Sequence, residues 1–168
     1  MQTFEEFKEL AGKYKTVPVH EQVLADLLTP ISAYMRIAKD HPYTFLLESV
    51  EKGTQYARYS FLGVNPQKIF ISSKNRTMII ENGKETISNN SFIQLLREVK
   101  NQYNAPELNG FPGFTGGLVG YLGYETITWI EDIPIHGFTE NDIPDAVFML
   151  FEDMIAFDHL KGQIIVFS

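Results

Sequence analysis

The stretch Phe114-Thr-Gly-Gly-Leu-Val-Gly-Tyr-Leu-Gly-Tyr-Glu125 places four glycines, at positions 116, 117, 120 and 123, inside an apolar run. Glycine weakens the interior of a strand, because it has no side chain to pack and loses much conformational freedom on folding. Its presence there indicates a bulge, a ligand or another backbone that approaches closely. We expect residues 114–123 to form a central strand over which another element packs closely.

Two nucleotide-binding motifs do not fit this stretch. A phosphate-binding P-loop needs Lys and then Ser or Thr after its last glycine, whereas Tyr124 and Glu125 follow here. A dinucleotide-binding fingerprint needs its glycines in a turn between a strand and a helix. The glycines therefore predict close packing rather than a nucleotide site.

Helices and antiparallel strands are expected around this stretch. Apolar residues recur at helical spacing in residues 3–14 and 91–103, and the Thr29-Pro30 start predicts a further helix over 29–40. Short β-prone runs predict strands at 43–50, 56–64, 68–72, 77–81, 85–88, 146–158 and 163–168. Because the strands come in runs instead of alternating with helices, the pattern predicts an α+β fold with helices packed on antiparallel β-sheets.

Local signals predict where several elements begin and turn. Thr29-Pro30 is a helix start, because Thr caps the helix and Pro suits its first position. Asn82-Gly83 predicts a tight hairpin, since both residues tolerate positive φ. The strongly apolar residues 45–47 predict that the strand 43–50 is buried on both faces.

Composition limits the class of protein. The net charge is −7 and there is no cysteine. An acidic chain without a basic face does not fit nucleic-acid binding, and the lack of cysteine suits a cytoplasmic protein. The N-terminal residues lack the apolar core of a signal peptide, and no run approaches the roughly 18 apolar residues that cross a bilayer. We expect a cytoplasmic protein with no nucleic-acid or membrane partner.

The last residues, 163–168, form an apolar run typical of a strand. Such a run needs a pairing partner, because open strand edges promote association. We therefore expect this chain to be the front part of a longer protein.

Residue types that carry catalytic or metal chemistry are scattered along the chain. The four histidines are widely separated, which predicts surface or loop positions and no metal site: His20, His41, His136 and His159. No Gly-x-Ser-x-Gly elbow indicates a hydrolase. The acidic stretch 131–145 predicts a solvated loop, with a magnesium site as the less favoured alternative. The residues thus assign neither a catalytic group nor a metal ligand.

Glu48 is the charged residue with the clearest consequence, because it directly follows an apolar strand centre. Such a side chain must reach solvent, pair with a cation or bind a ligand. Glu48 and Ser49 together offer partners for a ligand's ammonium group and one further polar atom, while apolar neighbours hold its side chain. The alternative is an ion pair of Glu48 with Lys52 or Arg58. Spacing alone favours the ion pair and leaves both accounts open.

Four segments together resemble one family. They are residues 28–34, 45–51, 58–63 and 114–125, and they occur in the family's order through most of the chain. The chain resembles the N-terminal region of anthranilate synthase component I. The resemblance implies that full-length relatives convert chorismate to anthranilate and pyruvate, using Mg²⁺ and ammonia from a glutamine amidotransferase subunit, component II.

The resemblance also implies feedback inhibition by L-tryptophan. It implies a ligand-binding role in the tryptophan pocket for Leu47, Glu48 and Ser49, with Pro30 as a neighbouring candidate and Arg58, Tyr59 and Ser60 as weaker ones. With the family included, ligand binding becomes the favoured account of Glu48 and Ser49.

The family's chorismate and magnesium residues lie in its C-terminal half, which also completes the tryptophan pocket. The resemblance therefore implies that residues 1–168 are a regulatory domain, inactive alone and without a cofactor. It implies part of a sandwich of orthogonal antiparallel sheets flanked by helices. A detached N-terminal part would expose strand edges, so we expect it to self-associate.

Two alternatives stay open. Aminodeoxychorismate synthase component I has a similar N-terminal region, although Glu48-Ser49 and the full glycine strand favour the anthranilate enzyme. A stand-alone amino-acid-binding module is the other alternative, and the apolar strand that reaches Ser168 argues against it.

Overall fold

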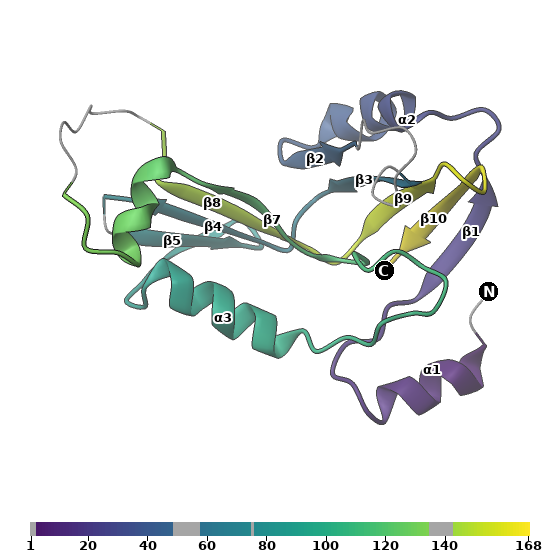
Figure 1. Ribbon diagram of the computed structural model, residues 1–168, viewed down its shortest axis with the longest axis horizontal. Helices are drawn as coiled ribbons and strands as arrows, with labels where there is room; N and C mark the ends of the chain where they lie inside the picture. The colour runs from purple at the N-terminus through teal and green to yellow at the C-terminus, as the bar shows by residue number, and fades with distance from the viewer. Residues whose placement is uncertain (1–2, 49–57, 75, 135–142) are drawn as a thin grey trace. The chain divides into compact units, whose positions relative to one another are not determined.

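The chain forms two five-stranded antiparallel sheets with a few helices, which confirms the α+β fold (Figure 1). This computed structural model describes residues 3–48, 58–74, 76–134 and 143–168. The first unit comprises Met1–Pro66, Lys100–Gly117 and Phe151–Ser168. The second comprises Gln67–Val99 and Leu118–Leu150.

The first unit contains a sheet, here called sheet A, with the strand order β1-β10-β9-β3-β2. Its strands are β1 (His20–Leu24), β2 (Thr44–Leu47), β3 (Tyr59–Val64), β9 (Met154–Asp158) and β10 (Gln163–Phe167). Its helices are α1 (Phe4–Ala11), α2 (Pro30–Ile37) and the 3₁₀ turn η1 (Ala38–Asp40). The strand β10 pairs with β1 on one side and β9 on the other, so the apolar run at 163–168 finds partners within the chain.

Side chains alternate between the two faces of sheet A. On one face, Met154, Ala156, Ile165 and Phe167 are buried under apolar residues of the 104–116 loop, including Phe111. On the other face, Phe157 and Ile164 pack against Ala33 of α2. Sheet A is therefore covered by α2 on one side and by an irregular loop on the other.

The second unit contains a sheet, here called sheet B, with the strand order β6-β5-β4-β8-β7. Its strands are β4 (Lys68–Ser73), β5 (Arg76–Glu81), β6 (Lys84–Ser88), β7 (Gly117–Leu122) and β8 (Ala146–Phe151). The helix α3 (Phe92–Gln102) and the 3₁₀ helix η3 (Tyr124–Trp129) belong with it. The Phe92 ring lies 5.7 Å from the Trp129 ring and 6.1 Å from the Phe148 ring, between centroids.

The predicted helix caps and the predicted hairpin turn are present in the structure. Thr29 caps α2 reciprocally with Ser32, and Pro30 takes the first helical position. Thr3 caps α1 and Ser91 caps α3 in the same way, through Glu6 and Gln94. Asn82 and Gly83 adopt φ values of 51° and 73° in the β5–β6 hairpin.

The glycine strand is placed differently from the prediction. Residues 117–122 form β7, at an edge of sheet B rather than at its centre. Close approach is nevertheless present, because a Cβ on Gly120 would clash with the Val147 carbonyl oxygen and lie 2.6 Å from the Phe148 Cα in β8. The glycine therefore accommodates the neighbouring strand of its own sheet, not a covering element.

The prediction of one long strand at 146–158 is wrong. Glu152 and Asp153 form an exposed bend, which ends β8 in sheet B and begins β9 in sheet A. Acidic residues are poor strand formers, so the interruption has a local cause that the apolar flanks concealed.

The prediction of surface or loop positions is also wrong for His20. It lies in β1, with its ring centroid 4.1 Å from that of Phe111. Its Nδ1 is buried and has no hydrogen-bond partner among the described residues. Burial lowers the pKa of His20, so the ring stays neutral at neutral pH.

The described helices include none that is long and apolar enough to cross a membrane.

Candidate functional site

The strand register brings most of the candidate residues to one end of sheet A. In the antiparallel pair of β2 and β3, Leu47 lies opposite Phe61. In the next pair, Tyr59 lies opposite Asp158, the last residue of β9. The end of β2, the start of β3 and the end of β9 therefore meet at this end, which we call the Glu48 end.

Leu47 and Glu48 are exposed at the Glu48 end, Leu47 to 47%. The prediction of a strand buried on both faces is wrong here, because β2 is an edge strand and Phe45 alone of residues 44–47 is buried. An apolar side chain and a carboxylate are thus accessible at consecutive positions at the end of β2, where successive side chains point to opposite faces of a strand. Ser49, the third predicted pocket residue, lies outside the described residues.

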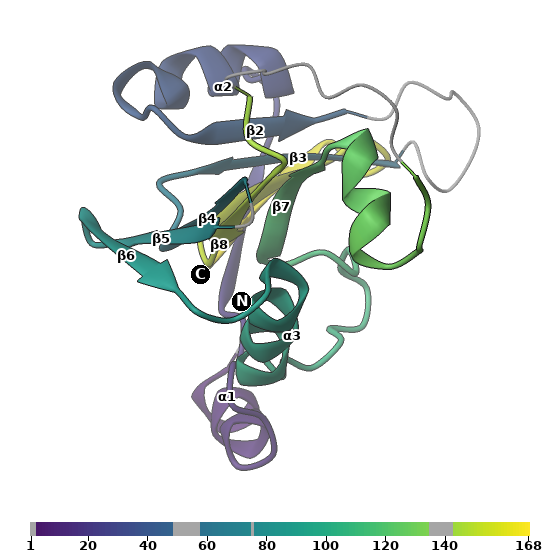
Figure 2. The same ribbon diagram turned by 90° about the vertical axis from the view of Figure 1, so that its left-hand side faces the viewer.

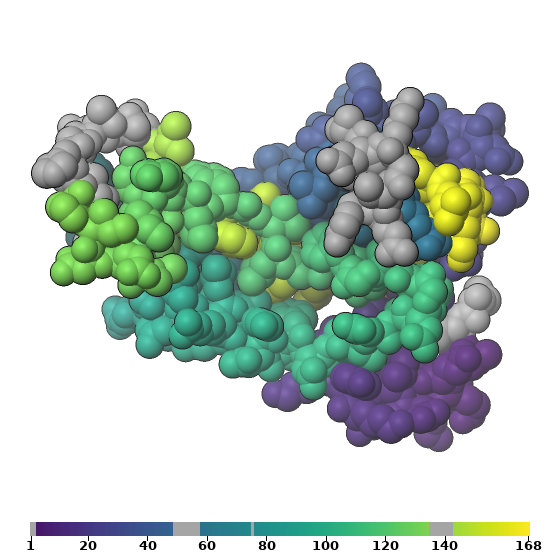
Figure 3. Space-filling model, in the orientation of Figure 1, coloured from purple at the N-terminus to yellow at the C-terminus, as the bar shows by residue number. Residues whose placement is uncertain are grey.

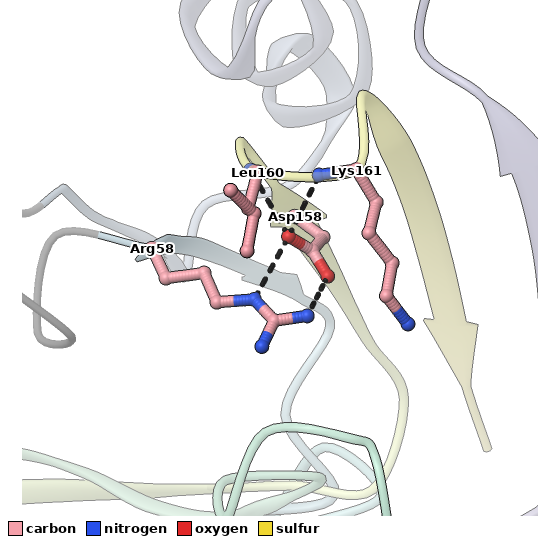
Figure 4. A network of polar contacts seen from close by, with 4 residues as sticks. All are labelled: Arg58, Asp158, Leu160 and Lys161. Carbon is pink, nitrogen blue, oxygen red and sulfur yellow. Dashed lines mark hydrogen bonds and ion pairs between the residues drawn. The ribbon is translucent and has the colours of Figure 1, made fainter.

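Arg58 is held by Asp158 (Figure 4), and the described ion pairs do not join it to Glu48. Its Nε and Nη2 donate to the two carboxylate oxygens of Asp158 at 3.0 and 2.6 Å. The N–H groups of Leu160 and Lys161 donate to Asp158 Oδ1 at 3.1 and 3.2 Å. The account in which Glu48 pairs with Arg58 therefore fails, and Lys52, the other cation considered, lies outside the described residues.

The environment of Asp158 explains its charge state. Its side chain is only 1% exposed, whereas that of Arg58 is 29% exposed. Burial raises the pKa of Asp158, but the bonds from Arg58 and from the Lys161 and Leu160 N–H groups outweigh it and hold the pKa below its usual value. The carboxylate consequently stays ionised and ties β3 to the turn after β9.

Tyr59 and Ser60 also have partners within the chain. The Arg58 guanidinium carbon lies 4.8 Å from the centre of the Tyr59 ring. Burial, followed by the Asp158 carboxylate, raises the pKa of the Tyr59 hydroxyl. The Oγ of the buried Ser60 lies 2.7 Å from His159 Nε2. His159 belongs to the exposed turn 159–162, which is yellow in Figure 3. Because the Ser60 side chain is buried, this Ser–His pair is not presented to a substrate.

Pro30 is the first residue of α2. Figures 1 and 2 show α2 lying along β2, with the chain reversing between them, so that the start of α2 and the end of β2 lie on the same side. The Tyr34 hydroxyl and Thr44 Oγ1 are 2.8 Å apart and join the two elements. The fold thus brings the Pro30 end of α2 toward the Glu48 end of sheet A.

Sequence reasoning missed Asp158, His159, Tyr34 and Thr44. Asp158 is 100 residues from Arg58, and no local pattern links the two. Tyr34 and Thr44 are closer, but their hydrogen bond depends on how α2 lies on the sheet. The local feature that did predict a site residue was an acidic residue directly after an apolar strand, and it identified Glu48.

Metal chemistry finds no support in the part of the chain that the structure describes. No group of three or more His, Cys, Asp or Glu side chains there could hold a metal ion. The described residues therefore present no preformed cluster of three metal ligands.

A family model described as chorismate binding enzyme matches residues 42–168. The chain therefore belongs to the chorismate-binding enzymes. Within this class it is similar to anthranilate synthase component 1 of Acetivibrio thermocellus, with 36% identity over 96% of this chain and 33% of that protein. The same protein of a Synechocystis species is 34% identical over 96% of this chain and 32% of its own length.

Solved structures agree with the sequence comparison. The crystal structure of anthranilate synthase component I from Streptococcus pneumoniae matches 86% of this chain and 30% of that chain, with a TM-score of 0.54 and 30% identity. The chain thus spans about a third of the length of the relatives it matches.

Proposed function

We propose that this chain is the regulatory, L-tryptophan-sensing part of an enzyme that converts chorismate to anthranilate and pyruvate. The observation that carries the enzymatic part is the similarity of nearly the whole chain to anthranilate synthase component 1. The full enzyme would take ammonia from a glutamine amidotransferase subunit and would use Mg²⁺ held by residues other than those described. A cytoplasmic location and self-association of the isolated part belong to the same proposal.

The exposed pair Leu47 and Glu48 supports an amino-acid ligand. A free amino acid carries an ammonium group, and a carboxylate makes strong charge-assisted hydrogen bonds to it. Glu48 is exposed and makes no ion pair with a described residue, which supports that role for its carboxylate. Leu47 is exposed at the same end of sheet A, and its apolar side chain is the candidate for contact with an indole ring.

Arg58 and Ser60 support this site in a different way from Glu48. Two of the five N–H donors of the Arg58 guanidinium are used by Asp158. The others, on a side chain that is 29% exposed, suit the carboxylate of the ligand. Ser60 is buried and bonded to His159, so we assign it to holding β3 in place.

The enzymatic proposal is tested on the complete gene product that contains this chain. We expect it to form anthranilate and pyruvate from chorismate and ammonia, and we expect L-tryptophan to inhibit the reaction. Anthranilate fluorescence measures the rate, and chromatography identifies the product. Accumulation of aminodeoxychorismate would favour the related synthase, and tryptophan binding without any turnover would favour a stand-alone binding module.

A further inference from the structure

One hydrogen bond joins the two elements that carry the proposed ligand residues. Tyr34, in α2, has its hydroxyl 2.8 Å from Thr44 Oγ1, in β2, and the contact is partly buried. The helix α2 carries Pro30 at its start, and β2 ends at Leu47. The bond therefore lies between the two pieces of chain that would contact the ligand together.

Among the described residues, α2 also makes apolar contacts with sheet A. Ala33 is buried against Phe157 and Ile164, with Leu28 packed beside them. Apolar contacts are non-directional, so they fix the position of the helix along the strands less sharply than a hydrogen bond does. A hydrogen bond needs a defined distance and angle, and so it fixes that position.

The spacing along both elements links this bond to the site. Tyr34 is one helical turn from Pro30, about 6 Å along the helix axis. Thr44 is three residues from Leu47, about 10 Å along the strand. Because the start of α2 and the end of β2 lie on the same side, a shift at the Tyr34–Thr44 contact changes the separation of Pro30 from Leu47 and Glu48 (Figures 1 and 2).

We propose that Tyr34 and Thr44 are positioning residues for effector binding, which set the separation between Pro30 and the Leu47–Glu48 pair. This inference rests on the proposed tryptophan-sensing function. Ligand-binding groups must be held to within about 0.5 Å by contacts behind them, and the Tyr34–Thr44 bond supplies such a contact. Removing it loosens the site without removing any group that touches the ligand.

The test uses the complete gene product and steady-state inhibition of anthranilate formation. We expect Tyr34→Phe and Thr44→Val each to raise the inhibition constant for L-tryptophan about fivefold, the effect of one lost hydrogen bond. The Michaelis constant for chorismate should stay unchanged. The double variant should match the single ones, because either change removes the same bond. Thr44→Ser keeps the hydroxyl and should restore inhibition close to that of the wild type.

The controls separate a failure of this inference from a failure of the proposed function. Tyr43→Phe changes the same residue type in the neighbouring connection and should leave inhibition unchanged. If L-tryptophan does not inhibit the wild type, both the proposed function and this inference are overturned. If the wild type is inhibited but Tyr34→Phe has the same inhibition constant, or loses turnover and inhibition together, this inference alone is overturned.

Discussion

Replacing Gly120 by alanine destabilises the protein by about 3 kcal/mol, at the upper end of what overpacking usually costs. The added Cβ would clash with the Val147 carbonyl oxygen and lie 2.6 Å from the Phe148 Cα. Both atoms belong to the backbone of β8, which cannot rotate away as a side chain would. Relief requires β7 to move away from β8, which weakens the attachment of this edge strand to sheet B. Urea denaturation followed by circular dichroism measures the loss.

Gly113→Ala is the matched control for Gly120→Ala. Gly113 lies in an exposed loop, and no heavy atom lies within 4 Å of the position that its Cβ would take. Its replacement should change the free energy of unfolding by no more than about 0.5 kcal/mol. Equal stabilities of the two variants would show that β7 and β8 do not approach as closely as described. Amide exchange of residues 117–122 locates the damage, since these amides should lose protection only in Gly120→Ala.

Replacing Asp158 by asparagine is expected to cost about 2 to 3 kcal/mol at neutral pH, because it removes charge-assisted hydrogen bonds at a buried position. The carboxylate accepts from Arg58 and from two backbone N–H groups of the turn, and the side chain is 1% exposed. Asparagine can satisfy some of these donors with its carbonyl oxygen, but its amide group then faces the guanidinium. Asp153→Asn, at an exposed position between β8 and β9, is the control and should be nearly neutral.

The Asp158 effect should also depend on pH in one direction. The pKa of Asp158 is lower in the folded protein than its usual value of 3.8. The stabilisation is therefore complete above about pH 4 and is lost as the pH falls through the lowered folded-state pKa. The stability difference between wild type and Asp158→Asn should shrink in acid. A constant difference from pH 7 to pH 2.5, or a neutral effect at pH 7, would contradict the role assigned to the pair.

Local sequence signals predicted the elements well but not their order in the sheets. Thr29-Pro30 and Asn82-Gly83 act within a few residues, so their outcome is determined locally. Whether a strand is central or at an edge depends on partners far away in the chain. The apolar character of residues 45–47 and the glycines of 114–123 therefore suggested buried strands, although β2 and β7 both lie at edges.

The candidate site was predictable to a similar extent. Glu48 could be found from its position after an apolar run, and the family resemblance supplied its proposed ligand. The ion-pair partner of Arg58 could not be predicted, because Asp158 belongs to a strand and lies 100 residues away in the sequence. That pairing matters, since it removes Arg58 as the ion-pair partner of the exposed Glu48.

The most direct measurement of the central claim is isothermal titration of the complete gene product with L-tryptophan. We predict that the wild type binds L-tryptophan and that Ser49→Phe and Glu48→Gln each weaken binding at least tenfold, since Glu48→Gln removes the partner of the ammonium group. Glu85→Gln, an exposed acid in β6, is the control and should bind like the wild type. Unchanged affinity in both Ser49→Phe and Glu48→Gln would contradict a tryptophan site at the Glu48 end.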